Sequence, residues 1–235
     1  MTSPAPEKAV VLLSGGLDSS VLLHYVKQRL GVDTVHALSF DYGQRHAVEL
    51  DCAAWQATQA GARHAIVPLS FLGPMLAPGS TLLAAGAPVP DLADLSSEQL
   101  TQPPTYVPHR NLLLLSLAAA YAEANGISDV YYGAQAQDEY GYWDCTQEFL
   151  TRINAVLALN RATPVLIHAP FVSNDKAANI ALGSSLGVDF AHTWTCYRGG
   201  DGQTEPRPCG TCPSCVERLQ AFARAGAADP LDYLA

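Results

Sequence analysis

The stretch Lys8-Ala-Val-Val-Leu-Leu-Ser-Gly-Gly-Leu-Asp-Ser-Ser20 decides the fold. Its apolar run from Ala9 to Leu13 predicts a buried strand, which ends at Ser14-Gly15-Gly16, and the pattern that follows predicts a helix over about 18–30. Glycines let backbone N–H groups approach a ligand, and a helix N-terminus adds unpaired donors and a positive dipole end. The turn therefore predicts an anion site, where Asp18 either caps the helix or holds Mg²⁺.

This turn differs from two common nucleotide loops, because no Lys follows its glycines and the spacing is not GxGxxG. Ser-Gly-Gly-x-Asp-Ser resembles instead the pyrophosphate (PP) loop of ATP pyrophosphatases, which split ATP between the α and β phosphates and adenylate an oxygen of their substrate. The alternative is an ordinary strand–turn–helix corner, which the hydroxyls and carboxylate around the glycines disfavour. The resemblance implies catalytic roles for Asp18 and Ser19. It implies ATP binding by Leu13, Ser14, Gly15, Gly16, Leu17, Asp18, Ser19 and Ser20.

Composition limits the class of protein. The chain has 235 residues, of which 49% are hydrophobic and 15% charged, enough for one large α/β core with a small appendage. Its net charge of −9 provides no basic field for a phosphate backbone, so no nucleic-acid partner is expected. No run of eighteen apolar residues and no signal-peptide core occur, so we expect no membrane association and a cytoplasmic protein.

Strand patterns alternate with helix patterns along the chain. Strands are predicted over 34–40, 64–69, 129–134 and 163–169, and helices over 44–60, 112–125, 146–159 and 176–186. Such alternation is typical of βαβ units with right-handed crossovers. The sequence therefore predicts an α/β fold, a Rossmann-like doubly wound parallel sheet whose ligands lie beyond the carboxyl ends of the strands.

Two boundaries divide this pattern. Residues 70–105 are rich in Pro, Gly and Ser, and we expect them to form a lid over the nucleotide, although a passive surface insertion fits the same composition. We expect an ATP pyrophosphatase domain over 1–190 and a small metal-binding module with a C-terminal helix over 191–235.

Two cations stand near predicted helix N-termini. Arg110 is unfavourable there unless an anion lies close, which predicts a phosphate contact; a solvated or carboxylate-paired Arg is the alternative. Lys176 begins the helix predicted over 176–186 and could reach a phosphate or remain a surface lysine. Both are candidate catalytic residues.

The stretch from Gln135 to Cys145 follows a predicted strand and holds three carboxylates, two Tyr and a Trp. Aromatic rings can stack on a planar base, and a carboxylate can accept from a guanine-like N–H edge. The alternative is a set of core aromatics beside a helix-capping Asp144. Candidate substrate-binding residues from this stretch and from Asp41–His46 are Tyr42, Arg45, Asp138, Tyr142 and Asp144.

Four of the six cysteines gather near the C-terminal end: Cys196, Cys209, Cys212 and Cys215. Clustered thiols in a chain without export signals favour metal binding over disulfides. Four thiolates suit a closed tetrahedral Zn²⁺ site, which stabilises a fold rather than performing catalysis. The spacing also occurs around iron–sulfur clusters, so spacing alone does not choose the metal.

Several motifs together resemble the 7-cyano-7-deazaguanine synthase family over nearly the whole chain. They are Leu13-Ser-Gly-Gly-Leu-Asp-Ser-Ser20, Phe40-Asp-Tyr-Gly-Gln-Arg-His46, Val107-Pro-His-Arg-Asn111, Tyr142-Trp-Asp-Cys145, and His192-Thr-Trp-Thr-Cys-Tyr197 with the three cysteines after it. The resemblance implies an ATP-dependent ligase of queuosine biosynthesis, which converts 7-carboxy-7-deazaguanine and ammonia to the nitrile through adenylated acid and amide intermediates. It also implies ATP and Mg²⁺ as cofactors, Zn²⁺ bound by the four cysteines, and a homodimer.

Three other classes share part of this pattern. A tRNA thiolase shares the Ser-Gly-Gly-x-Asp-Ser loop but needs a basic face, which the acidic total disfavours. An amidotransferase subunit would carry a glutaminase segment, and none is seen. A nucleotide sensor with a zinc module would not need the polar, aromatic stretch from Asp138 to Asp144.

Overall fold

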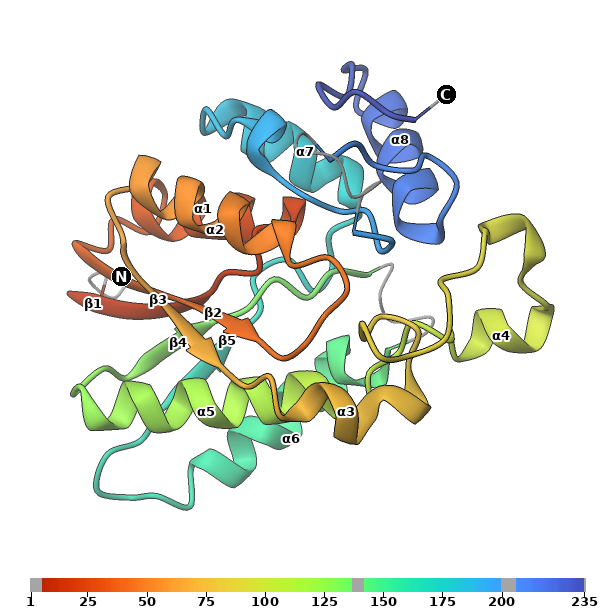
Figure 1. The fold of residues 1–235 in the computed structure, drawn as a ribbon. Helices are drawn as coiled ribbons and strands as arrows, with labels where there is room; N and C mark the ends of the chain where they lie inside the picture. Colours follow the sequence, from red (N-terminus) through yellow and green to blue (C-terminus); the bar gives the residue numbers. More distant parts are fainter. Residues whose placement is uncertain (1–5, 137–141, 200–205, 235) are drawn as a thin grey trace.

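A five-stranded parallel sheet forms the centre of the protein in a computed structural model, which describes residues 6–136, 142–199 and 206–234 (Figure 1). Across the sheet the strands run β3 (Arg63–Pro68), β2 (Thr34–Asp41), β1 (Lys8–Leu12), β4 (Asp129–Tyr131) and β5 (Leu166–His168). The chain builds outward from β1 to β3, then returns and builds in the other direction from β4. This confirms the predicted doubly wound α/β fold, with β1 as the central strand.

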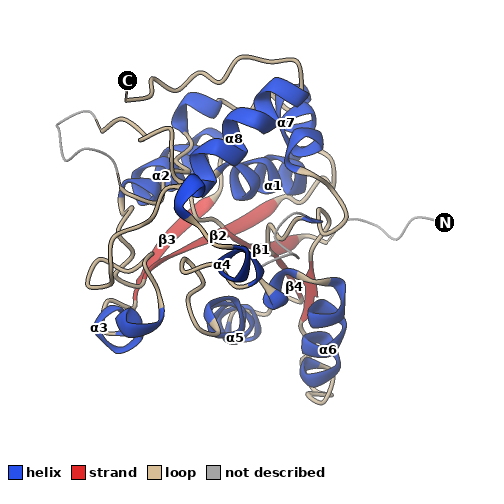
Figure 2. Ribbon diagram, turned by 90° about the vertical axis from the view of Figure 1, so that its right-hand side faces the viewer, coloured by secondary structure: helices blue, strands red, loops and turns tan. Residues whose placement is uncertain are grey.

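Helices cover both faces of the sheet (Figure 2). One face carries α1 (Leu17–Gln28), α2 (Val48–Gln59), α7 (Lys176–Ser185) and α8 (Pro213–Arg224). The other carries α3 (Leu72–Leu76), α5 (Arg110–Ala124) and α6 (Gln147–Leu157). Among the described residues, no helix has both the length and the apolar character that a bilayer crossing requires.

The central strand explains this layering. Successive side chains of a strand point to opposite faces, and both faces of β1 are buried. Ala9 and Val11 pack with residues of α1, α2, α7 and α8, whereas Val10 packs with residues of α5 and α6. A strand that is buried on both faces has a continuous apolar sequence, which is why the run from Ala9 to Leu13 predicted a buried strand.

The start of α2 differs from the prediction of a helix from residue 44. The helix begins at Val48, because Gln44 uses its side chain to close a turn after β2. Its Oε1 accepts from the Tyr42 N–H at 2.9 Å and its Nε2 donates to the Phe40 carbonyl at 3.0 Å. A buried side chain that replaces backbone partners in this way delays the helix.

Residues 70–105, predicted to be a lid or a passive surface insertion, contain regular structure. They include α3, α4 (Ser97–Thr101) and two short 3₁₀ turns, η1 (Ala77–Gly79) and η2 (Leu92–Asp94). A capping box stabilises the start of α4, in which Ser96 and Gln99 satisfy each other's backbone N–H groups. Short elements of this kind lack the periodicity by which helices are recognised in a sequence.

A buried ion pair fastens the C-terminal segment to the core. Arg218 on α8 is fully buried and binds both carboxylate oxygens of Asp229, at 2.8 and 3.0 Å. The same guanidinium donates to the Phe190 carbonyl at 3.0 Å and to Thr193 Oγ1 at 2.8 Å. Phe190 begins η5 (Phe190–His192), and Thr193 directly follows it. Arg218 therefore links α8, the chain end and the segment that leads to Cys196.

Replacing this arginine with a similar apolar side chain tests the linkage. We expect Arg218→Met to destabilise the protein by about 3–5 kcal/mol, because it leaves the Asp229 carboxylate buried without its partner. Denaturant unfolding measures the loss. Arg152→Met is the matched control, since it removes an exposed arginine from the Glu148 pair on α6; an equal loss in both variants would contradict the account.

Candidate active site

A cavity opens beyond the carboxyl ends of β1, β2 and β4, where the strand order reverses between β1 and β4. This is the position at which ligands bind in open α/β sheets. Segments from the N-terminal, middle and C-terminal parts of the chain contribute to its wall. The polar and aromatic lining residues include Ser14, Asp18, Ser19, Tyr42, His46, Glu49, Arg110, Asn111, Tyr132, Tyr142, Lys176, Trp194, Thr195 and Tyr197.

The glycine loop, defined as residues 13–20, comprises the turn after β1 and the first turn of α1, and it lines the cavity. Ser14 Oγ and Ser19 Oγ are 2.9 Å apart, and Ser14 Oγ also accepts from the Gly16 N–H at 3.2 Å. Gly16 is the N-cap of α1 and, as a glycine, has no side chain that could cap the first N–H groups of the helix. The first turn of α1 therefore presents backbone donors and hydroxyls to the cavity, a geometry suited to an anion.

Six of the eight predicted ATP-binding residues line the cavity, namely Leu13, Ser14, Gly16, Leu17, Asp18 and Ser19. Ser20 is fully buried, and its hydroxyl donates to the Gly16 carbonyl at 2.8 Å. Gly15 has φ +87°, and a Cβ there would lie 1.9 Å from the Glu49 carbonyl oxygen of α2. Only glycine fits this contact, so Gly15 sets the position of the loop rather than facing the cavity.

Asp18 lies within the first turn of α1 and does not cap it. Its Oδ1 accepts from Asn179 Nδ2 at 2.8 Å, and its Oδ2 is 3.7 Å from Lys176 Nζ. Burial raises the pKa of the Asp18 carboxyl, while Lys176 and then the Asn179 hydrogen bond oppose that rise. The structure therefore does not show the helix-capping role for Asp18, and the Mg²⁺-binding role stays a prediction.

Lys176 is buried at the start of α7 and bridges two carboxylates. Its Nζ lies 2.7 Å from Glu217 Oε2, closer than to Asp18. Glu217 comes from α8, two residues after Cys215, so the C-terminal helix holds a cation beside the glycine loop. No sequence motif marks Glu217 or Asn179, because α7, α8 and α1 meet only in the fold.

Arg110 begins α5 and faces the cavity beside the Tyr42 phenol, with Nη1 and the hydroxyl oxygen 3.4 Å apart. Burial disfavours the charge on Arg110, but Tyr42, Cys145 and Asp144 offset it and raise the pKa above its ordinary value. Burial also raises the pKa of Tyr42. A permanent cation in the wall opposite Lys176 gives the cavity two positive side chains for an anionic ligand.

The predicted substrate residues have different positions. Tyr142 lines the cavity, and its hydroxyl lies 2.8 Å from Thr105 Oγ1. Asp144 instead caps α5, because its Oδ2 accepts from the Asn111 N–H at 3.2 Å. This agrees with the helix-capping alternative, although the capped helix is α5 and not the helix that follows Asp144. Asp138 lies outside the described residues.

The structure does not bring Arg45 to the cavity. Its guanidinium donates to the backbone carbonyls of Leu83 and Gly86 at 3.1 and 3.0 Å, and so fastens the 70–105 segment to the end of β2. The neighbouring His46 lines the cavity instead, together with Glu49. The sequence analysis missed both, although His46 ends the Phe40–His46 motif, because a sequence does not show which way successive side chains point after a turn.

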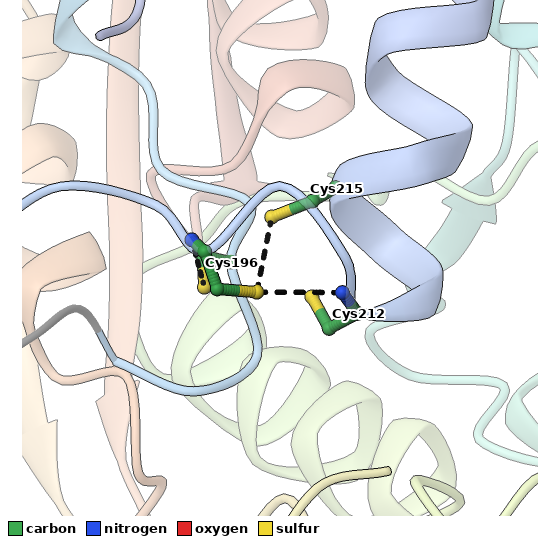
Figure 3. A group of neighbouring side chains, drawn as sticks. Cys196, Cys212 and Cys215 are labelled. Carbon is green, nitrogen blue, oxygen red and sulfur yellow. Dashed lines mark hydrogen bonds between the residues drawn. The ribbon is translucent and has the colours of Figure 1, made fainter. Parts of the chain in front are cut away.

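The four predicted cysteine ligands meet near the N-terminus of α8. Their Sγ atoms all lie within 4.8 Å of one another, and Figure 3 shows three of the side chains pointing toward a common centre. Cys212 is the N-cap of α8, and its N–H lies 3.3 Å from Cys209 Sγ. Four sulfurs bound to one zinc ion at 2.3 Å would be about 3.8 Å apart, so this donor set fits a shared tetrahedral ion.

Comparison with known proteins agrees with this arrangement. A family model described as "Queuosine biosynthesis protein QueC" matches residues 8–226. A 7-cyano-7-deazaguanine synthase of Alteromonas mediterranea is 42% identical, over 97% of this chain and 99% of that protein. One of Archaeoglobus fulgidus is 44% identical, over 95% of this chain and 89% of that protein.

A solved structure shares the fold at low sequence identity. The U34-tRNA thiolase NcsA from Methanococcus maripaludis, with its [4Fe-4S] cluster, superposes with a TM-score of 0.50 at 14% identity. The match covers 94% of this chain and 66% of the thiolase, and at that identity it bears on the fold alone. The sequence relatives go further, since the family model and the synthases cover almost the whole chain, and they establish that this protein belongs to the QueC family of queuosine biosynthesis proteins.

Proposed function

We propose that this enzyme converts 7-carboxy-7-deazaguanine and ammonia to 7-cyano-7-deazaguanine at the expense of ATP. The observation that carries the proposal is the glycine loop at the point where the strand order reverses. The chain that holds this loop is 42% identical to a 7-cyano-7-deazaguanine synthase, over 99% of that synthase's length. Queuosine or another 7-deazapurine product is the destination of the nitrile.

The chemistry requires two activations. A carboxylate has no leaving group, so adenylation of one oxygen supplies AMP as one, and ammonia displaces it to give the amide. Adenylation of the amide oxygen then allows its loss as a second AMP, which leaves the nitrile. No covalent enzyme intermediate is needed, and catalysis consists of positioning and charge neutralisation.

The glycine loop supplies the phosphate donors in this proposal. Ser14, Ser19 and the first N–H groups of α1 bind the phosphates, and Lys176 and Arg110 neutralise their charge. Asp18 is the carboxylate that would hold Mg²⁺, the ion that shields phosphate charge when bound. Support comes from the convergence of these five side chains on one cavity.

The planar base is assigned to the aromatic side of the cavity, where Tyr42 and Tyr142 offer rings and hydroxyls. Asp138 remains a proposal for the guanine-like edge. We also propose a homodimer in the cytoplasm, free ammonia as the nitrogen donor, a functional division at about residue 190, and a lid role for residues 70–105.

For the cysteine cluster we propose structural zinc. All four sulfurs belong to one closed set with three of the side chains buried, which leaves no open position for a substrate. Zinc would hold Cys196 to the start of α8, and the segment before Cys196 supplies Trp194 and Thr195 to the cavity wall. The metal would therefore shape the site without taking part in the reaction.

Mass spectrometry of the complete reaction tests the function. The purified protein is incubated with ATP, Mg²⁺, ammonium and 7-carboxy-7-deazaguanine, and we expect the nitrile, AMP and pyrophosphate. An enzyme that binds ATP but leaves this substrate unchanged would contradict the substrate assignment. The tRNA thiolase and the nucleotide sensor would then be the functions to test.

Lys176 provides a residue-level test. We expect Lys176→Met to lower kcat by about 10²–10³-fold, because it removes a cation placed where phosphate charge develops. Steady-state pyrophosphate release measures the effect. Lys27→Met is the matched control, since Lys27 Nζ donates to the Asp33 carbonyl away from the cavity; unchanged kcat in Lys176→Met would reject the role.

Metal analysis tests the cysteine cluster. We expect about one zinc ion per chain, strong loss of metal in Cys212→Ser, and a lower Tm for that variant. Cys52→Ser should keep the metal, because Cys52 lies outside the cluster and burial raises the pKa of its thiol to about 11. Iron and sulfide with visible absorption in place of zinc would overturn the assignment.

A further inference from the structure

A buried histidine–carboxylate pair stands in the cavity wall next to the glycine loop. His46 is 5% exposed and Glu49 7%, both line the cavity, and His46 Nε2 lies 3.2 Å from Glu49 Oε2. The second oxygen of Glu49 accepts from Gln44 Nε2 at 3.2 Å, and Gln44 is itself held by the Phe40 carbonyl. The carboxylate is therefore fixed on both sides and orients the imidazole.

The other ring nitrogen of His46 has no such contact. Nδ1 is buried and has no hydrogen-bond partner among the described residues. Leaving a buried polar atom without a partner costs about 1–3 kcal/mol, and such atoms are few in native proteins. The Glu49 carboxylate 3.2 Å from Nε2 favours the neutral tautomer with its proton on Nε2. That tautomer keeps its lone pair on Nδ1, which makes Nδ1 a proton acceptor.

The proposed reaction needs such an acceptor. Ammonia brings three hydrogens, and the nitrile nitrogen keeps none, so three protons leave the same nitrogen. The first leaves after the nitrogen–carbon bond forms, as the carbon–oxygen bond breaks and AMP departs with the electron pair. The other two leave when the adenylated amide loses its second AMP and the carbon–nitrogen triple bond forms. Each proton needs a base near the reacting carbon.

Three other ionisable side chains of the cavity are less suited to act as this base. Asp18 is engaged by Asn179 and faces Lys176 beside the glycine loop. Tyr42 is a weak proton donor and acceptor at neutral pH, since burial raises its pKa and Arg110 lies against its hydroxyl. The ring of Tyr197 packs on His46 with centroids 6.0 Å apart, and a phenol oxygen is a much weaker base than an imidazole nitrogen.

We propose that His46, oriented by Glu49, is the general base that removes protons from the attacking nitrogen. The assignment rests on the proposed synthase function and adds a residue to it. Because adenylation precedes nitrogen attack, loss of this base slows the nitrogen step and spares adenylate formation. His46 is the catalytic residue, and Glu49 is its positioning residue.

A change of nucleophile tests the assignment. His46→Gln retains an amide donor for Glu49 but removes the basic nitrogen. With ammonium we expect amide formation to fall by about 10²–10⁴-fold, the usual contribution of a general base. Hydroxylamine is a much weaker base, so water can take its proton after attack. Hydroxamate formation should therefore stay within about tenfold of the unmodified enzyme. Pyrophosphate release on the first adenylation should persist and shows that the variant is folded.

Two further variants test the roles of His46 and Glu49. Glu49→Gln should show the same selective loss with ammonium, at about tenfold or more, because the ring loses its orienting carboxylate. His192→Asn is the matched control, since His192 and Asp189 form the same i, i+3 pair outside the cavity at 2.9 Å. It should leave both nucleophiles unaffected.

The outcomes separate the two proposals. Equal losses with ammonium and hydroxylamine in His46→Gln, or no loss with either, would overturn the base assignment while the synthase function stands. Unmodified enzyme that makes neither amide nor hydroxamate from 7-carboxy-7-deazaguanine would overturn the function itself. A loss confined to ammonium supports both.

Discussion

The site depends on one close backbone contact between the glycine loop and α2. Gly15 lies so near the Glu49 carbonyl that a Cβ at Gly15 would be 1.9 Å from it. On its other side, the Gly15 carbonyl accepts from the Trp194 N–H at 2.9 Å. A residue without a side chain thus fixes the loop, the helix that carries Glu49 and the segment that leads into the cysteine cluster relative to one another.

This contact explains how distant parts of the chain serve one cavity. Trp194 and Thr195 precede Cys196 and form part of the wall, and Glu217 follows Cys215 and holds Lys176 at 2.7 Å. In the proposed zinc site, the cysteine cluster would act on the cavity through the position of these neighbours. Four sulfurs around one ion would constrain two chain segments and leave no coordination position for a reactant.

The sequence predicted the parts of the structure that are coded locally. The apolar run and paired glycines placed β1 within one residue, and the alternation of strands and helices predicted the parallel sheet. The four cysteines were recognised because metal ligands recur at short intervals. These features need only neighbours in the chain to be visible.

The remaining site depends on where side chains point after the chain turns. Arg45 and His46 are adjacent, yet Arg45 binds the 70–105 segment and His46 faces the cavity. Asp144 caps a helix that precedes it in sequence. Glu217 and Asn179 meet Lys176 and Asp18 only through the packing of α7 and α8 on α1. No local pattern encodes such contacts.

The most direct test of the account follows the oxygen atoms of the substrate. If both activations are adenylations in this cavity, 7-carboxy-7-deazaguanine labelled with ¹⁸O in its carboxylate should pass one labelled oxygen to each of two AMP molecules. The label then appears in AMP by mass spectrometry, and pyrophosphate remains unlabelled. Label in pyrophosphate, inorganic phosphate or water in place of AMP would contradict the account.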